Sequence, residues 1–175
     1  NLVPYFAIGI FAGLRPSEIS GVPGERRGLQ WSDIAEDYSS ISIRRAVAGK
    51  TGRPRIIDLT HPIDIQTTLR QWLTPYRSDS KRYVAPMSAN NLLSRANTDA
   101  RWVLPWPKDG VRHSFVSYYY ALSGDIQRTS QMAGNSPPVA HENYNNPRHR
   151  TEAEKWLTLT PPVVGRPLGK WSGSK

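Results

Sequence analysis

The sequence predicts an α+β domain that is mainly helical and carries a small three-stranded antiparallel sheet. Residues 40–47 and 53–59 are short runs in which apolar and polar residues alternate, most clearly at Ile41 and Ile43. Turn residues separate the two runs, which is typical of a β-hairpin. Residues 29–34, Leu-Gln-Trp-Ser-Asp-Ile, supply the third predicted strand. Elsewhere the apolar residues recur mostly at helical spacing, so helices form the body of the predicted domain.

The predicted helices have recognisable beginnings and ends. Residues 2–11 are apolar nearly all round, which indicates a buried helix, and Gly13 is placed to end it. Pro16 stands in the first turn of the next, short helix, where its missing N–H costs nothing. Gly124 and Gly134 are placed to end two later helices. The expected helical segments are 2–11, 14–19, 62–73, 88–103, 109–122, 126–133, 138–144 and 152–159.

Length and composition predict one folded domain. A chain of 175 residues can bury a real core, and 38% hydrophobic residues with six Trp indicate a folded protein. No apolar run approaches eighteen residues, so no membrane span is expected. The chain opens without an initiator Met, and we interpret it as a fragment. Because cysteine is absent, disulfides and thiolate catalysis are excluded, and a reducing compartment is favoured.

The charge balance favours a polyanionic partner. The chain has 23 Lys and Arg against 14 Asp and Glu, a formal net charge of +9. Nucleic acid is such a partner, because each neutralised phosphate releases condensed counterions. A basic domain without a nucleic-acid role remains the alternative.

A few residues suit phosphoryl transfer. Arg112 stands at the start of an aromatic helix and Tyr144 follows some way along the chain. An arginine side chain binds phosphate through a fixed fork of donors, and a tyrosine oxygen can attack one. Arg15 lies between a buried helix and a short one, so a partly buried position is expected, although most arginines are solvated. Lys50 lies on the predicted hairpin tip, where a solvated charge is the plain alternative.

These residues lie in motifs that resemble those of the tyrosine recombinases, the phage-integrase family. Residues 13–19, Gly-Leu-Arg-Pro-Ser-Glu-Ile, resemble the first-arginine motif, and residues 29–34 resemble the tryptophan-and-aspartate strand after it. Residues 50–59 are similar to the family's hairpin, with Lys50 at the catalytic lysine. Residues 111–115, Val-Arg-His-Ser-Phe, resemble the second-arginine motif, and Asn143-Tyr144 resembles the nucleophile segment.

The resemblance implies a catalytic domain over residues 1–159, followed by a basic, Pro/Gly-containing tail at 160–175. It implies site-specific breakage and rejoining of double-stranded DNA, as in the integration or excision of phages and mobile elements, without metal or other cofactor. Self-assembly into a multimer on DNA and a cytoplasmic, nucleoid-associated location are implied with it. The last helix, 152–159, is expected either to dock on a neighbouring protomer or to pack on its own domain.

The same resemblance implies a role for each site residue. Arg15 and Arg112 would hold the non-bridging oxygens of the phosphate, and preorganised donors of this kind contribute roughly 10²–10³ in rate each. Tyr144 would be the nucleophile, giving a 3′-phosphotyrosine linkage. Lys50 would donate a proton to the departing 5′ hydroxyl.

Three further expectations concern neighbouring side chains. Glu18 is expected either to orient site groups or to act as a helix N-terminal charge. His113 directly follows Arg112 on a helix, so we expect it to buttress the site. The aromatic run Tyr118 to Tyr120 is expected to be core in preference to a base-stacking platform.

Two positions depart from the family pattern. Asp109 stands where histidine is usual, and as a carboxylate it can only accept hydrogen bonds. Asn135 stands where histidine or tryptophan is usual, and its amide can still donate. Asp109 or His141 are minor candidates for a base toward Tyr144. The sequence therefore leaves three functions open: an impaired recombinase, a degenerate DNA-binding relic, and a nicking enzyme like the type IB topoisomerases.

Overall fold

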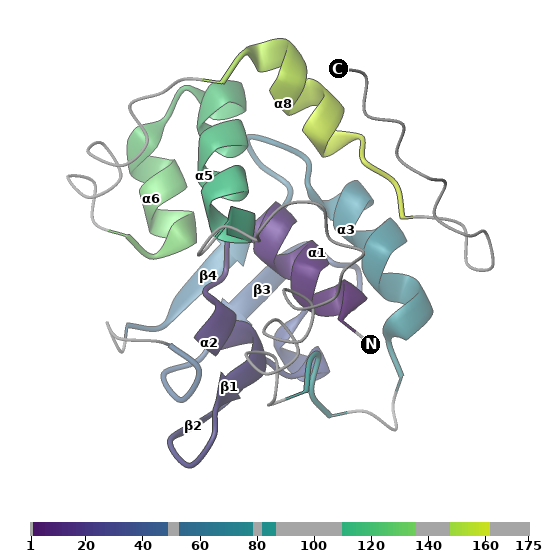
Figure 1. Cartoon of the computed structure of the whole chain (residues 1–175), viewed down its shortest axis with the longest axis vertical. Coiled ribbons are helices and arrows are strands. Elements are labelled where there is room, and N and C mark those ends of the chain that lie inside the picture. Colours follow the sequence, from purple (N-terminus) through teal and green to yellow (C-terminus); the bar gives the residue numbers. More distant parts are fainter. Residues whose placement is uncertain (1, 49–52, 79–81, 87–109, 136–147, 162–175) are drawn as a thin grey trace, which may run out of the picture.

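The computed structural model describes residues 2–48, 53–78, 82–86, 110–135 and 148–161 (Figure 1). The predicted fold class is confirmed, since helices make up about half of the described residues and the strands pair in small antiparallel sheets. The helices are α1 (Val3–Ala12), α2 (Pro16–Ser20), α3 (Gln66–Leu73), α5 (Gly110–Ser123), α6 (Ile126–Ala133) and α8 (Arg150–Leu157), with 3₁₀ turns η1 (Trp31–Asp33) and η2 (Thr74–Tyr76). The strands are β1 (Gly21–Val22), β2 (Arg26–Arg27), β3 (Ser40–Ile43) and β4 (Arg55–Asp58).

The predicted hairpin of residues 40–59 is confirmed by the pairing of β3 with β4. The two strands run antiparallel, with Ser40 opposite Asp58 and Ile43 opposite Arg55. Ile41 and Ile57, which pair across the hairpin, face the core, whereas Ile56, the residue before Ile57, is 74% exposed. The hairpin tip at 49–52, which includes Lys50, lies outside the described residues.

The prediction of a third strand at residues 29–34 is wrong. Residues 31–33 form η1, and pairing is limited to isolated bridges of Gln30 with Tyr83 and of Ile34 with Ile41. The cause is local: the Asp33 carboxylate accepts the Gln30 backbone N–H at 2.8 Å, and the Asp33 N–H donates to the Gln30 carbonyl at 3.0 Å. An aspartate that caps its own turn competes successfully with the extended conformation.

A short hairpin that the sequence pattern does not predict follows α2. Strands β1 and β2 pair antiparallel, with Gly21 opposite Arg27. The chain then returns to α2, where the Leu29 N–H donates to the carbonyls of Glu18 and Ile19 at 3.0 and 3.1 Å. Gly28 makes this return possible, because a Cβ there would lie 2.4 Å from the Ile19 carbonyl oxygen. The β1–β2 hairpin therefore projects from the domain, and the chain segments before and after it are hydrogen-bonded to each other.

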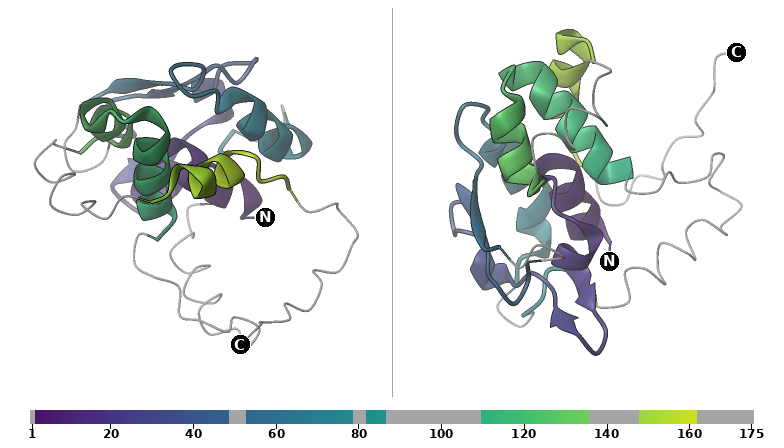
Figure 2. Two further views of the ribbon diagram at one scale, coloured as in Figure 1. Left: turned by 90° about the horizontal axis from the view of Figure 1, so that it is seen from above. Right: turned by 90° about the vertical axis from the view of Figure 1, so that its left-hand side faces the viewer.

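Helix α1 is the centre of the packing, as its apolar sequence predicts. It contacts α3 and α5, with β3 and β4 on its other side (Figure 2). Its buried Phe11 lies 5.4 Å from the ring of Trp156 in α8. On α5, Tyr119 is fully buried and Tyr118 stacks on Trp156 at 5.7 Å. The interpretation of the aromatic run as core is confirmed for these two tyrosines.

The last helix packs on its own domain. Helix α8 lies against α5, and its Ala153 and Trp156 are buried there. It spans Arg150–Leu157, two residues earlier than predicted. Of the two predicted alternatives for the last helix, the described residues therefore show packing on its own domain.

Helix α3 begins at Gln66, later than the predicted residue 62. Asp64 binds the backbone N–H and the hydroxyl of Thr67 at 3.3 and 3.0 Å, which fixes a turn just before the helix. The predicted helices at 88–103 and 138–144 lie outside the described residues. Among the described helices, none is long and apolar enough to cross a membrane.

Candidate active site

Two helix-ending glycines turn their carbonyls toward the predicted arginines. Gly13 ends α1 and Gly134 ends α6, each in the left-handed conformation, with φ of 66° and 67°. A Cβ at Gly13 would lie 2.2 Å from the Phe115 ring, so no larger residue fits. The Gly13 carbonyl accepts from Arg112 at 2.7 Å, and the Gly134 carbonyl accepts from Arg15 at 2.6 Å.

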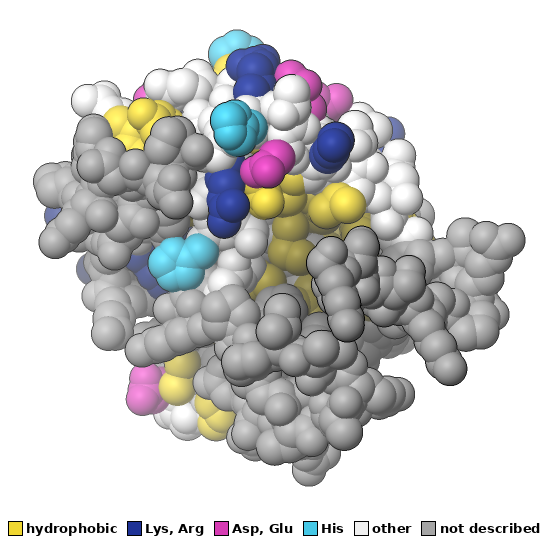
Figure 3. All heavy atoms as spheres, turned by 45° about the horizontal axis from the view of Figure 1, so that its top comes forward, with side chains coloured by type: hydrophobic (Ala, Val, Ile, Leu, Met, Phe, Trp, Pro, Cys, Tyr) yellow, Lys and Arg dark blue, Asp and Glu magenta, His cyan; other side chains and the backbone are white. Residues whose placement is uncertain are grey.

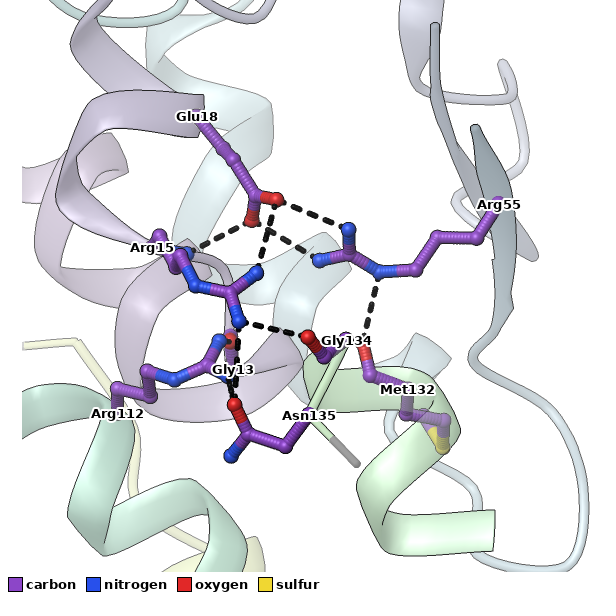
Figure 4. Close-up of polar contacts among 8 residues, drawn as sticks. All are labelled: Gly13, Arg15, Glu18, Arg55, Arg112, Met132, Gly134 and Asn135. Atoms are coloured by element: carbon purple, nitrogen blue, oxygen red, sulfur yellow. Dashed lines mark hydrogen bonds and ion pairs between the residues drawn. The ribbon is translucent and has the colours of Figure 1, made fainter. Parts of the chain in front are cut away.

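Arg15 and Arg112 converge on one oxygen atom (Figure 4). The Asn135 Oδ1 accepts from Arg15 at 3.1 Å and from Arg112 at 2.5 Å. Because guanidinium groups only donate, the amide must present its oxygen to them. The loop after α6 thus places a hydrogen-bond acceptor between arginines contributed by α2 and α5.

A buried carboxylate, that of Glu18, contacts Arg15 from the other side and also binds Arg55. Glu18 is fully buried, and Arg55 of β4 binds both of its oxygens at 2.9 Å. Glu18 also accepts from the Arg15 backbone N–H at 2.9 Å and lies 3.5 Å from the Arg15 guanidinium. Burial by itself would raise the pKa of Glu18, but the hydrogen bonds and charge of Arg55, then of Arg15, together lower it.

Arg55 is the site residue that sequence reasoning missed. Its Nε also donates to the Met132 carbonyl at 3.1 Å, so it joins β4 to the end of α6 as well as to α2. The sequence held one signal for it. Side chains at alternate positions of a strand point to the same face, so Arg55 shares the inward face of β4 with Ile57. An arginine on an inward face requires acceptors that compensate its charge, and for Arg55 these are the Glu18 carboxylate and the Met132 carbonyl.

Among the described residues, the cluster has more positive than negative groups. The guanidinium groups of Arg15 and Arg55 contact the Glu18 carboxylate, and Arg112 joins them through Asn135. Arg112 is only 6% exposed, so its charge acts in a poorly hydrated environment. A hollow of about 730 Å³ opens between β4 and α6, and Arg55, Gly134 and Asn135 of the cluster line it.

The structure brings together four of the predicted site residues, namely Arg15, Glu18, Arg112 and Asn135. Glu18 is a buried partner of arginines, which favours the orienting role over that of a solvated helix charge. His113 lies exposed on α5. The predicted roles of Lys50, Asp109, His141 and Tyr144 stay predictions, because these residues lie outside the described ones. Within the described residues, no group of three or more His, Asp or Glu could hold a metal ion.

Solved structures with a similar fold are tyrosine recombinases. The crystal structure of XerA recombinase matches with a TM-score of 0.53 at 16% sequence identity, over 87% of this chain and 54% of that one. Two structures of the Tn1549 transposon integrase in complex with circular intermediate DNA match with TM-scores of 0.50 and 0.52 at 16% and 18% identity. They cover 87% of this chain, which spans 56% and 57% of theirs. No protein-family model and no curated protein sequence matches the chain.

Proposed function

We propose that this chain, which has the fold of the tyrosine recombinases, is the catalytic part of a site-specific DNA recombinase. The observation that carries the proposal is the convergence of Arg15 and Arg112 on one acceptor oxygen, the Asn135 Oδ1. A non-bridging phosphate oxygen is an acceptor of the same kind with more negative charge. The Tn1549 integrase was solved with DNA, which supports double-stranded DNA as the substrate.

The proposed reaction exchanges one phosphodiester for another. The Tyr144 oxygen attacks a DNA phosphorus atom, and the bond from that phosphorus to the 5′ oxygen of the next nucleotide breaks. The phenol proton passes to water or to a neighbouring base, for which Asp109 and His141 are the candidates, and the leaving 5′ oxygen takes a proton from Lys50. The product is a 3′-phosphotyrosine, and attack by a second 5′ hydroxyl reverses the step on a new strand. Exchange between two duplexes requires several protomers on the DNA, so we propose self-assembly there.

The arginines act on the charge that builds up during this attack. The pentacoordinate transition state carries more negative charge on its non-bridging oxygens than the ground state does. Arg15 and Arg112 are held by Gly134 and Gly13 before substrate arrives, so little reorganisation is needed. Arg55 holds Glu18, and Glu18 in turn fixes Arg15.

Formation of a covalent adduct tests the proposal. The 175-residue chain is incubated with a nicked suicide duplex, and the protein–DNA adduct is resolved on a denaturing gel. We expect an adduct from the wild type and none from Tyr144→Phe, because phenylalanine lacks the attacking oxygen. An adduct that persists in Tyr144→Phe excludes Tyr144 as nucleophile. A wild type that binds duplex DNA but forms no adduct is the DNA-binding relic.

Asn135 is expected to compete with the phosphate for the arginines. Asn135→Ala removes the internal acceptor, and each hydrogen bond contributes about 0.5–1.5 kcal/mol, so duplex DNA should bind severalfold more tightly. Asn135→Asp places a carboxylate between the arginines and should weaken binding by about tenfold or more. Both dissociation constants are measured in the Tyr144→Phe background, where no cleavage interferes. Weaker binding by Asn135→Ala would show instead that Asn135 organises the arginines for the phosphate.

A further inference from the structure

A second group of arginines lines a separate hollow of about 410 Å³. Its walls come from the β1–β2 hairpin, from the chain after β3 and from the segment 82–86. Arg27, Arg44, Arg45 and Arg82 all contribute to the lining, and Glu25 is the carboxylate among the lining residues. These four arginines are exposed to solvent, unlike those of the candidate active site.

Tyr83 holds two of these arginines in place. The Arg27 guanidinium donates to the Tyr83 hydroxyl at 3.0 Å, and the Arg82 guanidinium lies over the Tyr83 ring, 5.7 Å from its centroid. The segment is itself fixed: the Trp31 N–H donates to the Arg82 carbonyl at 3.1 Å, and the Val84 N–H to the Leu29 carbonyl at 3.0 Å. The donors are therefore ordered before a ligand arrives, which lowers the cost of binding.

The hollow keeps a surplus of positive charge. Asp33 engages Arg44 through two hydrogen bonds, one of them 2.8 Å long, and raises the pKa of Arg44. Among the described residues that line the hollow, Arg27, Arg45 and Arg82 then stand with one carboxylate, that of Glu25. The face around α5 and α8 differs, since positive, negative and histidine side chains mix across it (Figure 3). There Arg150 pairs with Glu154 at 3.2 Å.

The backbone segments that form the wall of the hollow are connected to segments of the candidate active site. Leu29, next to Gln30 in the wall, donates its N–H to the carbonyl of Glu18. On the other side, residues 44–47 of the wall lead directly into the hairpin tip that carries Lys50. In double-stranded DNA, successive phosphates of one strand are spaced by about 3.4 Å along the helix axis. A duplex bound at Arg15 and Arg112 therefore has further phosphates beyond the one that these arginines hold.

We propose that Arg27, Arg45 and Arg82 bind a backbone phosphate of the duplex other than the one that Arg15 and Arg112 hold. This inference rests on the proposed function, because it takes DNA as the substrate. Exposed arginines that bind phosphate give affinity and register without reading base sequence. The hollow is therefore a positioning contact, and its loss should leave the chemistry at the bound phosphate unchanged.

The test is the salt dependence of duplex binding by the 175-residue chain. In the Tyr144→Phe background, the slope of log K against log salt is compared for the parent and for Arg27→Ala with Arg82→Ala. We expect the double variant to lose about 0.9 from the slope, since these arginines bind one phosphate and each phosphate contributes about 0.9. Arg148→Ala with Arg150→Ala, which removes the same charge from the α8 end, is the matched control and should keep the parental slope. Thermal unfolding confirms that the variants are folded.

The outcomes separate this inference from the proposed function. If the parent binds DNA and both double variants lose the same slope, the arginines act only through net charge and the second phosphate site is wrong. If the parent does not bind duplex DNA, the proposed function fails and the inference fails with it. With Tyr144 present, the Arg27/Arg82 variant should form adduct at the wild-type rate under saturating DNA. A fall in that rate would overturn the positioning role.

Discussion

Replacing Arg55 by methionine is expected to lower the free energy of unfolding at pH 7 by about 3–5 kcal/mol, because it leaves a buried charge without its main partner. Glu18 is fully buried, and Arg55 binds both of its oxygens at 2.9 Å. Arg15 is a weaker partner, at 3.5 Å and partly exposed. Methionine fills a similar volume but cannot donate, so the carboxylate loses most of its compensation. Urea unfolding at pH 7 measures the change.

The pH dependence provides an independent check on this explanation. The pKa of Glu18 is lowered in the folded protein, so its contribution to stability is complete above the unfolded value of about 4.5. That contribution is lost as the pH falls through the lower, folded value. In Arg55→Met the effect of burial dominates and should raise the pKa of Glu18. Protonation of Glu18 then favours the folded state of this variant, so its loss of stability relative to the wild type should shrink as the pH falls below 7.

Two further variants distinguish a buried charge from lost packing. Adding Glu18→Gln to Arg55→Met removes the uncompensated charge, so the double variant should be more stable than Arg55→Met alone. Destabilisation equal to the sum of the single changes would contradict the ion-pair explanation. Arg150→Met is the matched control, because it breaks an ion pair whose side chains are 66% and 56% exposed. Exposed pairs of this kind contribute about 0–1 kcal/mol.

Arg15 and Arg112 could be predicted from the sequence because each stands in a short local motif. Strand parity could place Arg55 on the inward face of β4, but its role could not be predicted, because that role depends on how β4 packs against α2 and α6 and no local window contains the contact. The failed strand at 29–34 has the opposite origin. There the alternation was real, but the capping carboxylate of Asp33 decided the local conformation.

The prediction for Asn135 shows what a motif leaves undetermined. Its position, next to the glycine that ends α6, could be read from the sequence, and in the structure its side chain contacts both Arg15 and Arg112. Which end of the amide faces the arginines depends on where the donors lie in space. Both guanidinium groups donate to its oxygen, so donation to a phosphate, if it occurs, must come from the amide nitrogen.

Arg112→Lys is expected to reduce the rate of adduct formation at saturating DNA by about 10²–10³, the effect of losing one preorganised donor group. Arg112 binds the Gly13 carbonyl and the Asn135 oxygen with separate nitrogens, at 2.7 and 2.5 Å. A lysine has a single nitrogen at its end and cannot hold both geometries. Its charge remains, so the DNA dissociation constant should rise by less than about tenfold.

The split between rate and affinity identifies what Arg112 does. If the variant loses affinity as steeply as rate, Arg112 contributes ground-state binding and the transition-state role is wrong. Arg77→Lys is the matched control, since Arg77 also donates to two carbonyls, those of Ala35 and Ile34, at 3.1 and 3.2 Å. It makes no contact with the candidate active site among the described residues, so its rate should match the wild type. If only Arg112→Lys slows the reaction, the guanidinium group with its two donor nitrogens is needed at this position. A general loss of arginine hydrogen bonds would not explain that result.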